Sequence, residues 1–260
     1  MSHGLAPRQV NIQGNTDTSF LKLLALVFMI IDHSGKMLFP QIHELRLLGR
    51  IAFPLYAWCL VVGSEYTRNE WRYALRIAVI GLVSQPFFMA GLGHTWTEPN
   101  IFLTLLLGLL GIIALKEKQY FSHIWGPVLV LVLGAILNPD YGWKGVFFVL
   151  ILYGARKSRS ALAVTFLTFC LFWGSGGANT TFFGWTLPMP DNPDVAAMIT
   201  PFLRTQTMAW MALPLMVFPT NTHWKLPKWL GYSAYPLHLA ILAVIVHYQE
   251  IAAWASGLFA

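Results

Sequence analysis

Residues 20–39 read FLKLLALVFMIIDHSGKMLF, a mostly apolar stretch with the dipeptide Asp32-His33 near its far end. A helix crosses the hydrocarbon core of a bilayer with about 20 apolar residues, so this stretch predicts a membrane span. Ionisable side chains at membrane depth are costly and usually mark functional positions. The stretch therefore indicates a membrane protein with a functional site at or near the bilayer.

The composition of the whole chain agrees with a membrane protein. Of its 260 residues, 56% are hydrophobic and only 11% are charged, whereas about a quarter are charged in a typical soluble domain. The net charge of +6 comes from Lys and Arg residues that fall in short clusters between apolar segments. Such clusters report membrane topology, so we expect lipid and not nucleic acid as a partner.

Apolar segments that suit membrane helices recur along the chain. We predict an all-α, polytopic membrane helix bundle with about nine spans, within a range of about 8 to 11. The predicted spans cover residues 19–39, 45–64, 72–91, 99–115, 122–137, 141–155, 160–174, 204–218 and 232–249. Residues 1–18 form a polar tail before a single transmembrane domain, 19–260. The tail lacks the apolar core of a signal peptide, so we expect no cleavage.

The basic residues predict the orientation. They gather after every second predicted span, as Arg68, Arg72 and Arg76, then Lys116 and Lys118, then Arg156, Lys157 and Arg159, then Lys225 and Lys228. Cytoplasmic loops carry an excess of such residues, so these loops should face the cytoplasm. We expect a multi-pass protein of the cell membrane with a cytoplasmic N-terminus, an extracytoplasmic C-terminus and an extracytoplasmic loop at about 175–203.

Two arginines break this pattern, because Arg46 and Arg50 lie in a connection that is predicted to be extracytoplasmic. They are four residues apart and so share one helix face. Arg50 enters the apolar run IAFPLYAWCLVVG, where an Arg faces a polar cavity or a carboxylate. The structural alternatives are a salt bridge between Arg50 and Asp32 and an Arg46 side chain that reaches the interface.

His33 is the first candidate for catalysis, because its near-neutral pKa suits general-base chemistry. A histidine in a membrane helix can also be only a packing residue. Asp32 cannot be assumed to orient His33, because adjacent helical side chains point about 100° apart. Lys36, at i+4, is better placed to pair with Asp32. His238 is the second buried candidate, in SAYPLHLAILAVI, one turn after Tyr235.

The remaining polar and reactive groups have simpler interpretations. Cys59 and Cys170 lie inside apolar runs, so we expect small buried side chains and neither a disulfide nor a metal site. Three polar interruptions, Ser84-Gln85-Pro86, Pro99-Asn100 and Asn138-Pro139-Asp140, must face protein or water. Helix capping and loop chemistry are the alternative, and for Asn138 and Asp140 they are the preferred interpretation.

Five ordered blocks of this sequence resemble the TraX family. The blocks are LKLLALVFMIIDHSGKMLFP, LRLLGRIAFPLYAWCLVVG, EPNIFLTLLLGLLG, DYGWKGVFFVLILYG and YSAYPLHLAILAV. The family is named for the conjugation protein that acetylates the N-terminus of pilin, and it is grouped with the wider transmembrane acyltransferases. The resemblance implies transfer of an acetyl group from cytoplasmic acetyl-CoA to an extracytoplasmic amine or hydroxyl. The implied acceptor is a protein N-terminus, such as that of pilin, or a glycan.

The resemblance extends to Asp32, His33, Arg50, Asn100, Tyr141, Gly142 and His238, and the implied reaction suggests roles for these residues and for others near them. His33, Asp32 and Arg50 are expected to be catalytic, with neutral His33 as the general base or as an acylated nucleophile. The acceptor cavity is expected to contain Asn100, Tyr141, Tyr235, His238, Lys36 and Arg46. The phosphates of acetyl-CoA are expected to meet Arg68, Arg72, Arg76, Arg156 and Lys157, although each of these also fits the topology signal. We expect no metal, since no ligand spacing is present.

Two other classes of protein remain open at this point. A proton-coupled transporter would use Asp32, His33 and Arg50 as a proton relay, although the sequence shows no internal repeat. A noncatalytic assembly factor would only present its outer loops to a secretion machine. Binding of a thioester donor separates the enzyme from both alternatives.

Overall fold

The computed structural model describes residues 11–175, 181, 185, 189–222 and 224–248. The α-helices are α1 (Thr18–Met37), α2 (His43–Gly49), α3 (Ala52–Tyr66), α4 (Glu70–Leu92), α5 (Ile101–Glu117), α6 (Ser122–Ile136), α7 (Gly142–Ala155), α8 (Arg159–Gly174), α9 (Pro193–Ile199), α10 (Leu213–Val217) and α11 (Lys228–Val246). Three 3-10 helices are η1 (Gln119–Phe121), η2 (Thr200–Leu203) and η3 (Thr207–Ala212). No strand forms within these residues, which confirms the all-α prediction.

Helix length qualifies the predicted number of spans. In the described part of the chain, four helical segments are long and apolar enough to cross a membrane: Thr18–Met37, His43–Tyr66, Glu70–Leu92 and Gln119–Ile136. The other predicted spans coincide with α5 and with apolar helical stretches such as Gly142–Ala155, Arg159–Gly174 and Ser233–Val246 of α11, which do not meet the length and hydropathy of a span, so length and composition do not clearly give about nine. Polar turns end these helices early, and Asn100, for example, caps α5 by accepting a hydrogen bond from the Phe102 N–H.

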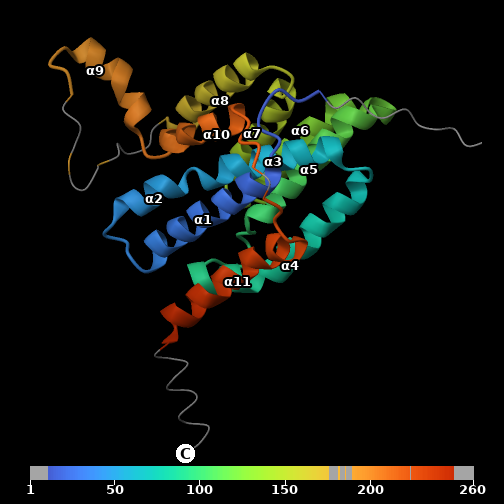
Figure 1. Ribbon diagram of the computed structural model, residues 1–260, viewed down its shortest axis with the longest axis horizontal. Coiled ribbons are helices and arrows are strands. Elements are labelled where there is room, and N and C mark those ends of the chain that lie inside the picture. Colours follow the sequence, from blue (N-terminus) through green and yellow to red (C-terminus); the bar gives the residue numbers. More distant parts are fainter. Residues whose placement is uncertain (1–10, 176–180, 182–184, 186–188, 223, 249–260) are drawn as a thin grey trace, which may run out of the picture.

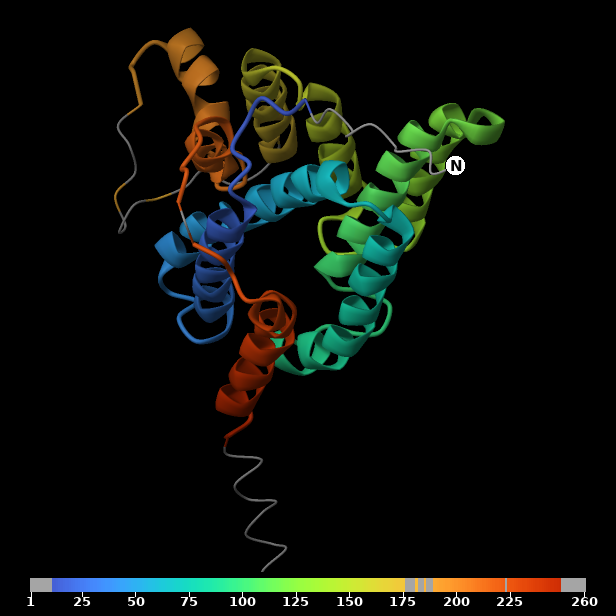
Figure 2. The same cartoon turned by 45° about the vertical axis from the view of Figure 1, so that its right-hand side comes forward.

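The helices are arranged around one another in a ring. Figure 2 shows α1, α3, α4 and α11 in this ring, while α2 lies against α1 in both views (Figures 1 and 2). Helix α11 packs on α4, and α1 packs on α3. Because α11 is the last helix and α1 the first, residues that are distant in sequence line the same pocket.

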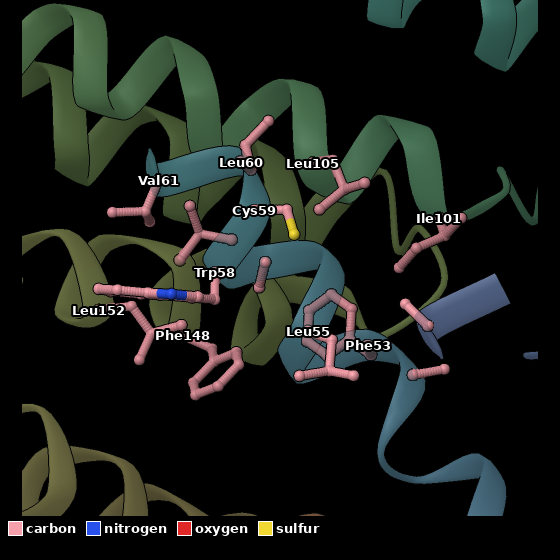
Figure 3. Close-up of a cluster of buried hydrophobic side chains, with 14 of the residues drawn as sticks. Phe53, Leu55, Trp58, Cys59, Leu60, Val61, Ile101, Leu105, Phe148 and Leu152 are labelled. Atoms are coloured by element: carbon pink, nitrogen blue, oxygen red, sulfur yellow. The ribbon is translucent and has the colours of Figure 1, made fainter. Parts of the chain in front are cut away.

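The apolar core is centred on α3. Trp58 is fully buried, and Figure 3 shows it among side chains from α3, α5 and α7, including Phe148 and Leu152. Both cysteines are free and buried, as predicted. Burial on nearly every side of α3 leaves little of this helix for lipid, so protein neighbours fix its position.

The segment before α1 is anchored by the core. Asn15 is buried, and its backbone N–H donates to the Met216 carbonyl (2.7 Å). The Trp58 indole N–H donates to the Asn15 carbonyl (2.7 Å). Asp17 caps α1 and accepts a hydrogen bond from the Thr222 N–H (2.8 Å). Burial alone would raise the pKa of Asp17, but hydrogen bonds, chiefly from Thr222, hold it below its ordinary value. The start of α1 is therefore tied to α10 and to the segment that follows it.

A buried ion network joins several helix ends on the side of the bundle where α1 begins. The Lys116 ammonium lies 3.0 Å from Glu65 and 2.8 Å from Glu70, while Arg156 lies 3.6 Å from Glu65. The Arg156 guanidinium also lies 3.6 Å from the centre of the Tyr153 ring. This network ties the ends of α3, α5 and α7 to the start of α4. These four helix ends lie next to the loops that the basic residues predict to be cytoplasmic.

Candidate functional site

The site begins with a carboxylate held between two guanidinium groups. Asp32 is 9% exposed, and its carboxylate accepts hydrogen bonds from Arg46 (2.7 Å) and Arg50 (3.1 Å). Arg50 also donates to the Gln206 side-chain oxygen (2.9 Å). The predicted pairing of Asp32 with Lys36 is wrong, because the Lys36 ammonium lies 3.0 Å from His94 Nε2 instead. The i+4 rule considers one helix, whereas here α2 packs against α1 and supplies better partners.

Gly49 makes this arrangement possible. A Cβ atom at Gly49 would lie 2.2 Å from Asp32 Oδ1, which is closer than any real side chain allows. The absence of a side chain lets the end of α2 approach α1 and aims Arg50 at Asp32. Two guanidinium groups around one carboxylate give this cluster a net positive charge. Such a fixed charge stabilises negative charge that develops nearby more strongly than water would.

His33 and His238 form the second part of the site. His33 Nδ1 lies 2.8 Å from His238 Nε2, and His238 Nδ1 lies 2.9 Å from the Ala234 carbonyl oxygen. A carbonyl only accepts, so His238 carries its hydrogen on Nδ1 and accepts on Nε2. His33 must then donate from Nδ1, which leaves its Nε2 with a free lone pair. The hydrogen-bond chain thus assigns the tautomer in which neutral His33 is ready to accept a proton.

Ring packing fixes the orientation of the two imidazoles. Their ring centres are 5.1 Å apart with an interplanar angle of 12°, so the two rings are nearly parallel. The Tyr235 ring meets His238 edge-on at 5.3 Å and His33 at 6.5 Å. His238 and Tyr235 are both buried, at 7% and 6% exposure. The packing holds the His33 ring in place without any contact from Asp32.

An elongated cavity of about 240 Å³ leads to this site. It begins at Ser19 and Lys22, near the start of α1, and reaches Asp32 and His33 near the other end of the helix. At 1.5 Å per residue, the 14 residues from Ser19 to His33 span roughly 21 Å. Its wall between these ends is mostly apolar, with Met29 as an example. We call this space the first cavity; it suits a long, thin ligand.

A second cavity of about 390 Å³ opens beyond the first. It is lined by Phe88, His94, Glu98, Pro99 and residues 138–144. Asp140 and Tyr141 line both cavities. The turn that contains them is therefore the boundary between the two spaces.

The structure separates the other predicted site residues into three groups. Tyr141, Tyr235 and His238 lie in or beside the first cavity, whereas Asn100 lines neither cavity. Asn100 instead bonds to Gly81 and Gln85 and holds α4 against α5. Among the basic residues, Arg68, Arg72, Arg76 and Lys157 are exposed, and Arg156 is paired with Glu65.

Three site residues escaped the sequence interpretation. Lys22 lines the start of the first cavity, Gln206 bonds to Arg50, and Asp140 borders both cavities. Lys22 is a single charge inside the first apolar stretch, and such a charge indicates a functional position. Gln206 lies 156 residues from its partner, and no local pattern reveals such a pair. Asp140 was interpreted as loop chemistry.

Comparisons with known proteins agree with one another. A family model described as "TraX protein" matches residues 17–246. The chain is 27% identical over 161 residues to a "Probable fimbrial assembly protein FimC, serogroup H1" of Dichelobacter nodosus, covering 56% of this chain and 66% of the relative. It is 23% identical over 155 residues to "Protein TraX" of Escherichia coli, covering 58% of this chain and 61% of the relative. An uncharacterized protein of Rickettsia prowazekii is 25% identical over 178 residues, with 66% and 67% covered. No solved structure matches the chain.

Proposed function

This chain belongs to the TraX family, and we propose that it is a membrane acyltransferase. It moves an acetyl group from cytoplasmic acetyl-CoA to an amine or hydroxyl acceptor on the extracytoplasmic side. The observation that carries the proposal is His33, which lies at the end of a long cavity with its Nδ1 2.8 Å from His238 Nε2. The names of the fimbrial assembly and TraX relatives favour a pilin N-terminus as the acceptor.

The proposed orientation places the start of α1 at the cytoplasmic face. The ion network of Lys116 and Arg156 gathers the loops that the positive-inside tendency assigns to the cytoplasm. The five other predicted spans are α5, α7, α8, η3 with α10, and α11. Counted with the four long segments, they give about nine crossings. The N-terminus is then cytoplasmic and the C-terminus extracytoplasmic, with His33 toward the outer side.

The donor enters the first cavity from its cytoplasmic end. Lys22 lines this end, and the Arg76 guanidinium lies 5.7 Å from the centre of the Tyr73 ring, which also lines the cavity. We assign contacts with the donor phosphates to Lys22 and Arg76, because phosphates attract such groups. Arg156 is engaged by Glu65 and has a structural role instead. The pantetheine arm extends along the apolar wall and brings the thioester to His33.

The reaction at His33 is a general-base transfer. His33 Nε2 takes the proton from the acceptor N–H or O–H as the acceptor atom attacks the thioester carbonyl carbon. The C–S bond then breaks, and His33 passes the proton to the departing thiolate. The products are the acetylated acceptor and free CoA. Arg50 and Arg46 hold Asp32, and the net positive charge of this cluster stabilises the oxyanion of the tetrahedral intermediate.

The proposal is tested with purified protein in detergent. Thiol release from acetyl-CoA is followed with peptide, amino-sugar and glycan acceptors for wild type, His33→Ala and the control His43→Ala. His43 is exposed at the start of α2, outside both cavities. We expect turnover to disappear in His33→Ala and to persist in His43→Ala. Equal turnover in all three proteins would move the chemistry away from His33, and failure to bind acetyl-CoA would favour a transporter or an assembly factor.

A further inference from the structure

We propose that the second cavity is the acceptor site and that Asp140 is the residue that positions the acceptor. This assignment rests on the proposed acyl transfer. It adds the route by which the acceptor reaches His33 and a residue for which the transfer mechanism above gives no role. The donor occupies the first cavity from one end, so the acceptor must approach from another direction.

The boundary between the two cavities is a well-held turn. Asp140 donates its N–H to the Pro99 carbonyl (2.8 Å), and Gly142 donates its N–H to the Pro139 carbonyl (2.6 Å). The Thr104 hydroxyl donates to the Asp140 carbonyl. Tyr141 has φ +69°, and its ring stacks on Phe53 with ring centres 4.1 Å apart. Since the backbone and the ring are both fixed, the Asp140 side chain has a defined position between the cavities.

The Asp140 carboxylate is available to a ligand. Its backbone groups are used by the turn, but its side chain makes no hydrogen bond or ion pair to any residue that the structure describes. Burial raises its pKa, while Arg50 and His94 act in the opposite direction. A partly buried carboxylate without a partner is costly. An acceptor that donates N–H or O–H, or that carries an ammonium group, removes this cost.

The chemistry of the two residues is complementary. Asp140 binds an ammonium group in the second cavity, and the ammonium loses its first proton to solvent through that cavity. The resulting amine attacks the thioester carbonyl carbon while His33 takes its second proton and transfers it to the leaving thiolate. A hydroxyl acceptor needs only the second proton transfer. Asp140 thus positions the nucleophile, and His33 performs the proton transfer.

The first test separates acceptor binding from donor binding. The probe is a short peptide with a free N-terminal amine, and the same peptide in acetylated form is the blank. We expect Asp140→Asn to raise the acceptor KM at least tenfold with the acetyl-CoA KM unchanged, and Asp140→Glu to restore part of the loss. Asp191→Asn, on an exposed segment, is the matched control. An unchanged acceptor KM, or equal increases in both KM values, would overturn the assignment.

The second test blocks each cavity separately. Lys144 lines the second cavity and Lys22 the first, so Lys144→Cys and Lys22→Cys are labelled with a bulky maleimide. Reagent-treated wild type is the control, because both native cysteines are buried. We expect labelled Lys144→Cys to bind acetyl-CoA but to lose transfer, and labelled Lys22→Cys to lose donor binding.

The two failures are distinguishable. Labelled Lys144→Cys that transfers acetyl groups at the rate of the unlabelled variant would overturn the acceptor site alone. Wild-type protein that binds no acetyl-CoA would overturn the proposed function and the acceptor site with it.

Discussion

His33 Nδ1 donates a hydrogen bond to His238 Nε2 across 2.8 Å, although 205 residues separate the two side chains. The Ala234 carbonyl fixes the tautomer of His238, and His238 fixes the tautomer of His33. A backbone oxygen in the last helix therefore decides which nitrogen of the first helix is free to accept a proton. The packing of α11 into the bundle is what couples them.

Replacement of His238 should slow the reaction without removing the donor site. In His238→Ala, His33 loses the neighbour that fixes both its tautomer and its ring orientation, so we expect kcat to fall about tenfold to a hundredfold. The acetyl-CoA KM should not change, because His238 does not line the first cavity. Steady-state kinetics on purified variants checks this, and a kcat equal to that of wild type would contradict the relay.

Loss of the Asp32 charge should destabilise the fold. Asp32→Asn leaves Arg46 and Arg50 without a counter-charge in a mostly buried site, and we expect a loss of about 3 kcal/mol in the free energy of unfolding. Thermal unfolding in detergent measures it, with Lys118→Ala, at the far end of α5, as a neutral control. Equal stability of Asp32→Asn and wild type would show that the charge of Asp32 does not stabilise the fold through Arg46 and Arg50.

Two glycines provide a matched pair. Gly49→Ala places a methyl group against Asp32, where a Cβ would lie 2.2 Å from Oδ1, and should cost about 1–3 kcal/mol of stability and lower activity. Gly154→Ala meets nothing within 4 Å and should be neutral or add about 0.5–1 kcal/mol. Unfolding curves and turnover of the two variants decide the matter. Similar behaviour of both would mean that the approach of α2 to α1 is looser than described.

Two basic residues, Lys22 and Arg156, should differ in their effect on the binding of acetyl-CoA. Lys22→Ala should raise the acetyl-CoA KM about tenfold, because one charge-assisted hydrogen bond is worth roughly 1.5–3 kcal/mol. Arg156→Ala should lower the unfolding temperature and leave this KM unchanged, because Arg156 pairs with Glu65. A raised KM in Arg156→Ala with an unchanged KM in Lys22→Ala would contradict this assignment and would indicate that Arg156 contacts the donor.

Asp17 predicts how stability depends on pH. Its pKa is depressed in the folded protein, so its contribution is complete above the ordinary value of 3.8 and is lost as the pH falls through the lower, folded value. Asp17→Asn can still cap α1 but does not titrate. Unfolding measured from about pH 5 to about pH 2 should show a steeper loss for wild type than for Asp17→Asn. Parallel curves would contradict the contribution of Asp17.

The sequence revealed most helices and the polar residues that interrupt them. Apolar runs located the helices well, but the run 45–64 hid a break, because α2 ends at Gly49 and α3 begins at Ala52. His33 and Arg50 were found because a charge or an imidazole in an apolar helix is conspicuous. The salt bridge of Arg50 with Asp32, first considered as a structural alternative, is confirmed.

Contacts between distant segments explain what the sequence missed. Lys36 was paired with Asp32 from helix spacing alone, but α2 places two arginines closer. The link from Arg50 to Gln206 depends on how η3 packs, which no local pattern encodes. Asp140 is a candidate because the two cavities meet at its turn, and no local sequence pattern predicts this meeting.

We propose that the protein transfers an acetyl group with His33 as the general base, and isotopically labelled acetyl-CoA tests this most directly. The peptide with a free N-terminal amine is incubated with labelled donor and either wild-type protein or His33→Ala, and its mass is measured. The account predicts a labelled acetyl group on the amine with wild type, and none with His33→Ala that still binds acetyl-CoA. Equal labelling by both proteins, or no labelling by wild type with bound donor, would contradict it.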